Sequence, residues 1–94
     1  MKIKISLPAT EDLDAIEAYI RKDNPDAAVR TVLKVLGTIE QLAEFPNIGR
    51  PGRIASTREL VVGGTPLIAI YGVREDTIFV YRVLHGARRW PPGN

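Results

Sequence analysis

Two prolines and two glycines fall within the eight residues 45–52 and divide this chain into two dissimilar parts. Before this segment, apolar residues recur mostly at the spacing of an amphipathic helix, and after it they form short runs that are typical of strands. Helices and strands that occupy separate parts of a chain favour an α+β architecture over alternating βαβ units. Because 94 residues are one domain's worth of chain, we expect a single domain that spans residues 1–94.

The first part begins with a short strand and a helix. Apolar and polar residues alternate over residues 2–7, which predicts a strand with one exposed face, and Pro8 ends that strand. A first helix should follow, with Thr10 as its cap. The acidic residues of segment 11–14 then suit the positive end of the helix dipole.

A second helix is predicted from Pro25 to about Glu44. Asn24 can cap it, and Pro25 suits the first helical position. The apolar residues of this helix form two rows, Ala28, Val32, Val35, Ile39, Leu42 and Val29, Leu33, Leu36. So wide an apolar surface predicts burial against more than one neighbour. Gly37 in its interior is either a tolerated glycine or a sign that the first helix approaches closely.

Three strands are expected after the loop, at residues 58–62, 67–73 and 78–84. Residues 63–66 turn between the first two, and a tight hairpin at residues 75–76 joins the others. The resulting order is β-α-α-β-β-β. It implies a two-layer α+β fold in which a helical hairpin packs on one face of a mainly antiparallel sheet.

Charge is unevenly divided along the chain. Residues 1–48 carry six basic and eight acidic side chains, whereas residues 49–94 carry seven basic and three acidic ones. All seven basic side chains of the second part are arginines. This asymmetry indicates an anionic partner for the arginine-rich part, with a merely solvated surface as the alternative.

The composition excludes several kinds of site. The chain has no cysteine and one histidine, so no thiolate nucleophile and no zinc site of cysteines or several histidines can form. No glycine-rich phosphate loop or acidic metal cluster is recognisable either, and we expect neither metal nor cofactor. A signal peptide and a membrane-spanning run are also absent from the pattern, which together with the missing cysteines fits a cytoplasmic protein.

Arginines form two groups, which a central last strand would bring to one side of the sheet. The first lies in or just after the loop (Arg50, Arg53, Arg58), and the second lies at the end of the last strand and beyond (Arg82, Arg88, Arg89). Their planar guanidinium groups match phosphate or carboxylate groups. Trp90, beside the second group, either clasps the tail to the body or anchors a partner. The residues expected to bind a target or an antitoxin are Arg50, Arg53, Arg58, Arg82, Arg88, Arg89 and Trp90.

Few residues could support acid–base chemistry. A histidine is the usual general acid near neutral pH, so His85 is the first candidate, although a lone histidine at a strand end more often has a structural role. Glu59 follows Arg58, but neighbours on a strand face opposite sides of a sheet, so these two do not form an obvious pair.

Arg82 lies within the last predicted strand. By alternation it should share a strand face with Ile78, Val80 and Leu84. A guanidinium in such a row reaches the sheet end, pairs with an acid or binds a ligand. The nearby aromatic residues are expected in the core or at its rim rather than as a base-stacking platform, and these are Tyr19, Tyr71, Phe79 and Tyr81.

Motifs in both parts of the chain resemble the ParE branch of the ParE/RelE toxins. In the second part they are Gly49-Arg50-Pro51-Gly52-Arg53, the segment 57–62 and the segment 82–91. In the first part they are the segments 11–16, 19–20, 23–25 and 42–46. The match covers essentially the whole chain in the correct order.

The resemblance implies a RelE/ParE-like fold and a bacterial type II toxin, of the kind linked to plasmid stabilisation, neutralised by a ParD-like or other small antitoxin. ParE-type members inhibit DNA gyrase, and RelE-type members cut messenger RNA in the ribosome. RelE-like nucleases generally place an arginine near the start of the middle strand, whereas residues 65–71 here contain none. This departure favours ParE, so we expect an inhibitor that binds DNA gyrase and has no active site of its own.

Two alternatives stay open. A ribosome-dependent endoribonuclease would use Glu59, Arg82 and His85. A degenerate, non-toxic relative would survive as a binding module or co-repressor. In each case an antitoxin segment is expected to fold onto the apolar stripe of the helical hairpin or the exposed sheet edge, with its acidic residues near the arginines.

Overall fold

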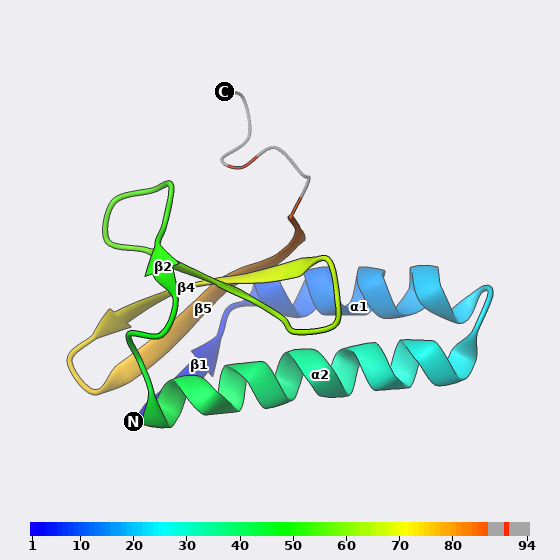
Figure 1. The fold of residues 1–94 in the computed structure, drawn as a ribbon, viewed down its shortest axis with the longest axis horizontal. Coiled ribbons are helices and arrows are strands. Elements are labelled where there is room, and N and C mark those ends of the chain that lie inside the picture. The colour runs from blue at the N-terminus through cyan, green and yellow to red at the C-terminus, as the bar shows by residue number, and fades with distance from the viewer. Residues whose placement is uncertain (87–89, 91–94) are drawn as a thin grey trace.

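The computed structural model describes residues 1–86 and Trp90 and contains a helical hairpin packed on a sheet (Figure 1). The elements follow in the order β1 (Lys2–Ile5), α1 (Leu7–Arg21), α2 (Pro25–Glu44), β2 (Arg50–Pro51), β3 (Arg58–Val61), β4 (Leu67–Arg74) and β5 (Thr77–His85). The predicted α+β class is confirmed, and β3, β4 and β5 each begin and end within one residue of the expected positions. The two-residue strand β2 is an addition, because we expected a loop throughout residues 45–52.

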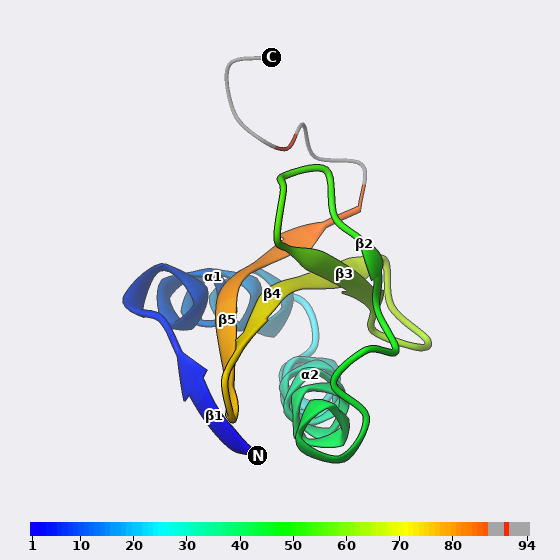
Figure 2. The ribbon, with the colours of Figure 1, turned by 90° about the vertical axis from the view of Figure 1, so that its left-hand side faces the viewer.

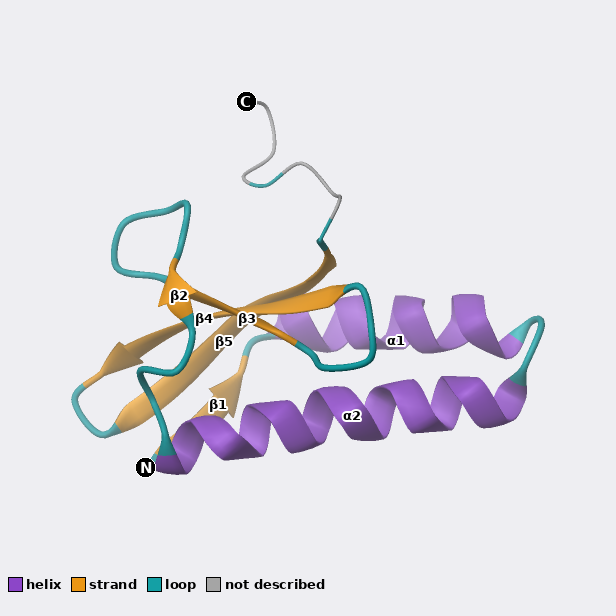
Figure 3. Ribbon diagram, viewed as in Figure 1, coloured by secondary structure: helices purple, strands orange, loops and turns teal. Residues whose placement is uncertain are grey.

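The sheet has five strands in the order β1-β5-β4-β3-β2. β1 runs parallel to β5, and every other neighbouring pair is antiparallel, as predicted for a mainly antiparallel sheet. Figure 3 shows the two helices running side by side along the sheet. Figure 2, in which α2 is seen end-on, shows how strongly the sheet twists between β1 and β3.

Apolar side chains are buried on both faces of the sheet. The larger cluster lies between sheet and helices and contains Ala9, Val35, Ile39, Leu42, Val62, Leu67, Tyr71, Ile78, Val80 and Val83. Because side chains alternate along a strand, Ile68 and Ile70 point to the other face, where they form a smaller cluster with Leu84. We call this second face, which the helices do not cover, the open face.

The first helix begins earlier than expected. Its cap is Ser6, whose hydroxyl oxygen accepts a hydrogen bond from the amide of Ala9 at 3.1 Å. Pro8 lies in the first turn, where its missing N–H and fixed φ are favourable. The prediction of Thr10 as the cap was therefore wrong, and no acidic residue lies in the first turn. Thr10 instead donates its hydroxyl to the carbonyl of Ser6 at 3.1 Å.

The second helix has the predicted bounds and the predicted Asn24 cap. Only one of its apolar rows is buried, since Val29 and Leu33 of the other row are 57% and 62% exposed. The predicted burial against more than one neighbour is confirmed, since α2 packs against both α1 and the sheet. The second row is largely left out of this packing. A Cβ built on Gly37 meets no atom within 4 Å. Gly37 is thus a tolerated glycine, and no element approaches it closely.

A β-bulge changes which side chains share a face of β5. The register against β4 slips after Ile70, and Tyr81 becomes the extra residue. Val80 before the bulge packs under the helices, whereas Arg82 after it pairs with Ile70 on the open face. The prediction that Arg82 shares a face with Ile78 and Val80 was wrong, because strict alternation does not continue through a bulge.

Neither α1 nor α2 meets the requirements of a membrane span. Within the described part of the chain, neither has a run of the length and apolar character that crossing a bilayer requires.

Candidate functional site

The first group of arginines surrounds one buried acid. Glu59 on β3 is 3% exposed, and β2 lies alongside it with Arg50 directly opposite in the ladder. The Glu59 carboxylate accepts a hydrogen bond from the backbone amide of Arg53 at 2.9 Å and one from Arg50 Nη2 at 3.1 Å. Arg53 Nε lies 3.5 Å from the same carboxylate. We call these three residues the Glu59 cluster.

The Glu59 cluster keeps its acid ionised. Burial alone would raise the pKa of Glu59, but the hydrogen bonds from the Arg53 amide and the Arg50 guanidinium, with the attraction of both positive charges, outweigh it and hold the pKa below its usual value. A buried carboxylate that fixed donors already occupy is a poor acceptor for a proton from a substrate.

Arg82 of the second group is held by an acid on α1. Asp12 accepts hydrogen bonds from Arg82 Nε at 2.7 Å and from Nη2 at 2.8 Å, and one from the amide of Val83 at 3.0 Å. The hydrogen bonds that Arg82 donates to Asp12 raise the pKa of Arg82. Of the alternatives for Arg82, pairing with an acid is therefore observed. The sequence pattern pointed to the helix dipole for Asp12 and contained no signal for this pair.

Asp12 also completes an edge of the sheet. β1 pairs with β5 only as far as Val80, so on that side the following backbone groups of β5 have no strand beside them. Ser6 Oγ donates to the carbonyl of Tyr81 at 2.9 Å, and Asp12 accepts from the amide of Val83. The first turns of α1 thus occupy the position of an edge strand.

Trp90 connects the two arginine groups across the open face. It packs against Ile68, Ile70 and Leu84, and the guanidinium carbon of Arg82 lies 5.7 Å from the centre of its ring. Arg53 Nη1 lies 3.4 Å from the Trp90 carbonyl oxygen. Arg53 and Arg82 are therefore brought together, as a convergence of the two groups predicts. Arg88 and Arg89 lie outside the described residues.

Arg58 belongs to a different part of the structure. It donates to the carbonyls of Gly49 at 2.7 Å and Asn47 at 3.3 Å, and it makes no ion pair with Glu59, as predicted from alternation. The buried hydroxyl of Tyr71 binds the same segment, since it donates to the carbonyl of Pro46 at 2.8 Å and accepts from the amide of Gly49 at 2.9 Å. Arg58 thus helps to hold the loop between α2 and β2.

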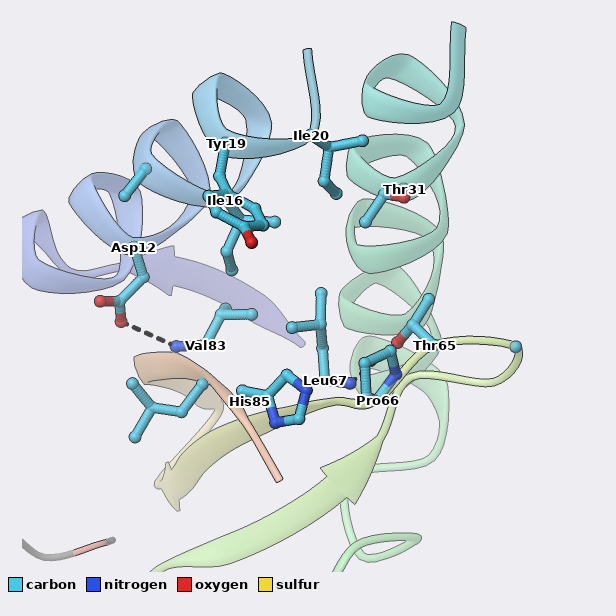
Figure 4. A pocket seen from close by; sticks show the side chains of 13 residues that line it. Asp12, Ile16, Tyr19, Ile20, Thr31, Thr65, Pro66, Leu67, Val83 and His85 are labelled. Atoms are coloured by element: carbon cyan, nitrogen blue, oxygen red, sulfur yellow. Dashed lines mark hydrogen bonds between the residues drawn. The ribbon is translucent and has the colours of Figure 1, made fainter. Parts of the chain in front are cut away.

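His85 lines an apolar pocket of about 520 Å³ on the helical side of the molecule (Figure 4). Ile16, Tyr19 and Ile20 of α1 form one wall, and Pro66 and Leu67 lie opposite. The other lining residues are Asp12, Ala15, Thr31, Gly64, Thr65, Val83 and Leu84. Glu59 and Arg82 do not line this pocket, so the three residues of the ribonuclease alternative do not surround a common cavity.

Metal chemistry has no evident support within the described part of the chain. Residues 1–86 and Trp90 contain no group of three or more histidine, cysteine, aspartate or glutamate side chains that could hold a metal ion.

The fold and these surfaces define a class of small two-layer α+β proteins known from toxin–antitoxin systems. A chain in the solved structure of a chromosomal ParDE TA system from P. aeruginosa superimposes with a TM-score of 0.83 and 25% identity, over 90% of this chain and 95% of that one. The family model for the ParE toxin of the type II toxin–antitoxin system parDE matches residues 3–90. This chain therefore belongs to the ParE toxin family, as the resemblance of its motifs predicted.

Two relatives of similar length carry the names of toxins. Y4kP of Sinorhizobium fredii is 46% identical over 90 residues, which are 96% of this chain and 93% of that protein. Toxin RelE2 of Caulobacter vibrioides is 39% identical over 80 residues, which are 85% and 89% of the two chains.

Proposed function

We propose that this toxin acts by binding DNA gyrase, with no active site of its own, and that a cognate ParD-like antitoxin neutralises it. Membership of the ParE family supports this proposal over RNA cleavage. The single observation that carries it is that two of the three candidate nuclease residues, Glu59 and Arg82, are already held in ion pairs.

Cleavage of RNA by its 2′-hydroxyl group requires a base, a proton donor for the leaving oxygen and cations for the phosphate. The side chain of Glu59 is 1% exposed and that of Arg82 is 24% exposed. Either residue would have to leave its partner before it could reach a substrate. His85 lines the pocket beside the helices, from which both are absent. This arrangement favours a surface that binds over a site that cleaves.

A supercoiling assay tests the proposal. Purified toxin, first shown to bind its antitoxin, should inhibit supercoiling by gyrase, and added antitoxin should restore it. Full gyrase activity in a large molar excess of such toxin would refute gyrase as the target.

A ribosome-dependent ribonuclease is the second candidate, and the 39% identity to a protein named Toxin RelE2 is the observation that favours it. Primer extension on translated messages should then reveal defined cuts that disappear in His85→Ala. Arg82→Ala is the less specific test, because it also breaks the ion pair with Asp12. If expression of the toxin without antitoxin leaves growth unchanged, the degenerate binding module becomes the better description.

For the antitoxin, the apolar pocket beside α1 is the surface that we propose. Tyr19 at its rim is 75% exposed, and most of the other lining side chains are apolar. Apolar anchors of an antitoxin segment that folds on binding would fill such a pocket. Asp12 lines the pocket and holds Arg82, so the segment would pass close to an arginine that acidic side chains can approach.

Charge insertion at the rim tests this docking site. Tyr19→Glu should weaken antitoxin binding at least about tenfold, since it places a carboxylate beside apolar anchors. Leu7→Glu is the matched control, because Leu7 is 70% exposed on the same helix and does not line the pocket. Equal affinities of the two variants, measured by calorimetry, would exclude the pocket as the antitoxin site.

A further inference from the structure

Acidic and basic side chains are divided more unevenly between the helical layer and the sheet layer than between the first and second halves of the sequence. The helical segment, residues 7–44, carries eight acidic and four basic side chains. Residues 1–6 and 45–86, which supply the strands and their connections, carry seven basic and three acidic side chains. The parallel pairing of β1 with β5 causes this difference, because it adds Lys2 and Lys4 to the arginines of the sheet.

Two exposed cations on the open face flank one aromatic ring. Lys4 Nζ lies 6.0 Å and the guanidinium carbon of Arg74 5.6 Å from the centre of the Phe79 ring. Neither cation has an acidic partner within 4.0 Å among the described residues, in contrast to Arg50, Arg53 and Arg82. Lys4 and Arg74 are therefore available to an anion from outside the molecule.

The same face continues beyond the ring. Phe79 is paired with Gly72, and a Cβ at position 72 would lie 2.9 Å from atoms of the Tyr81 ring, so Tyr81 packs directly over the glycine. Tyr81 is 36% exposed, and Arg82 follows it on the open face. Because Gly72 has no side chain, the Tyr81 ring can pack over it. The rings of Phe79 and Tyr81 thus form an aromatic surface with cations on either side.

Among the described residues, no acid forms an ion pair with Lys4 or Arg74. Glu59 is buried and already shared by two arginines. The remaining acidic residues of the strand-forming segments, Glu75 and Asp76, lie in the turn between β4 and β5. The described cations of the open face without an ion pair are therefore Lys4 and Arg74, whereas Arg82 and Arg53 are held by Asp12 and Glu59.

We propose that the part of the open face formed by Lys4, Arg74, Phe79 and Tyr81 binds the phosphate backbone of duplex DNA. Lys4 on β1 and Arg74 on β4 are separated by β5, which places their strands about 10 Å apart, a distance comparable to the width of a DNA groove. Unpaired cations on two strands that a third strand separates fit an extended polyanion better than a single phosphate group. The choice of DNA as the ligand rests on the proposed function. Gyrase binds DNA, so a toxin bound to gyrase could place its basic face against that DNA.

Salt-dependent binding of a mixed-sequence 20-base-pair duplex, followed by fluorescence anisotropy, tests this proposal. The toxin should bind, with an affinity that decreases as salt rises. In the double variant Lys4→Gln/Arg74→Gln the slope of log affinity against log salt should become less steep by about 2, since each lost phosphate contact removes about 0.9 from its magnitude. The matched control is Arg30→Gln/Lys34→Gln, which removes the same two residue types from exposed positions of α2. Its slope should equal that of the unaltered toxin.

Several outcomes would overturn the inference. They are no binding at low salt, equal slopes for the two double variants, or tighter binding of an RNA duplex of the same length. Supercoiling assays on the same samples separate this inference from the proposed function. Inhibition of gyrase by a toxin that does not bind DNA removes the inference only, whereas DNA binding without inhibition removes the gyrase proposal only.

Discussion

Asp12 on α1 and Arg82 on β5, 70 residues apart in the chain, are joined by two hydrogen bonds of 2.7 and 2.8 Å. The same carboxylate accepts the amide of Val83, so one side chain binds both the guanidinium and the backbone of β5. This contact fixes the helical hairpin against the strand that β1 covers only in part. It also sets the place of Arg82 beside Trp90 on the open face.

Replacement of this acid should destabilise the protein. Asp12→Asn leaves the half-buried guanidinium of Arg82 without its carboxylate, and we expect the free energy of unfolding to fall by about 1–3 kcal/mol. Urea unfolding followed by circular dichroism measures the change. Asp14→Asn serves as the control, because Asp14 is an exposed acid of the same helix. If the two variants lose the same stability, the ion pair with Arg82 contributes nothing.

Glu59 should make stability depend on pH in the acidic range. Burial raises the pKa of Glu59, but the Arg53 amide and the two guanidinium groups lower it by more, so the net shift of the pKa is downward. A depressed folded-state pKa stabilises the fold above the unfolded value of about 4.3, and this contribution is lost as pH falls through the folded-state value. Urea midpoints between about pH 7 and pH 3 should therefore decline less in Glu59→Gln than in the unaltered protein, and parallel declines would contradict the prediction.

The Tyr71 hydroxyl should contribute substantially to the stability of the fold. Tyr71→Phe removes the partner of the Pro46 carbonyl and of the buried Gly49 amide. Unpaired buried groups of this kind cost about 1–3 kcal/mol, which should lower the melting temperature by several degrees. Tyr19→Phe, at a residue that is 75% exposed, should leave the melting temperature unchanged.

Two glycines should respond to alanine in opposite directions. Gly37→Ala should raise the free energy of unfolding by about 0.5–1 kcal/mol, since the position is an exposed helix interior with no atom within 4 Å of the new Cβ. Gly49→Ala should lower it, because its Cβ would lie 2.7 Å from the Tyr71 hydroxyl oxygen. Thermal melts of both variants decide this, and destabilisation by Gly37→Ala would mean that a neighbour lies closer than the structure shows.

Much of the fold could be predicted from local patterns. The break at Asn24-Pro25 placed the start of α2, and the turn residues placed β3, β4 and β5 within one residue. The start of α1 was missed because Pro8 serves both as the end of a strand and as a first-turn residue of a helix. The exposure of Val29 and Leu33 could not be foreseen, since periodicity identifies an apolar row without naming what covers it.

The candidate sites were predicted as residue types and not as partnerships. Arg50, Arg53, Arg82 and Trp90 were identified, but their partners Glu59 and Asp12 were assigned other roles. The bulge at Tyr81 turned Arg82 to the open face, and such a slip leaves no mark in an alternating pattern.

The sequence by itself determined the kinds of elements, their order and most of their ends, because these depend on interactions between residues a few positions apart. It also determined the family, whose motifs lie along the whole chain. Only the tertiary structure decided which charges meet. Ion pairs such as Asp12 with Arg82, and the addition of Lys4 to the arginine-rich face, arise from the strand order and from the parallel pairing of β1 with β5. Contacts across tens of residues are set by how the layers pack, and no local pattern encodes that packing.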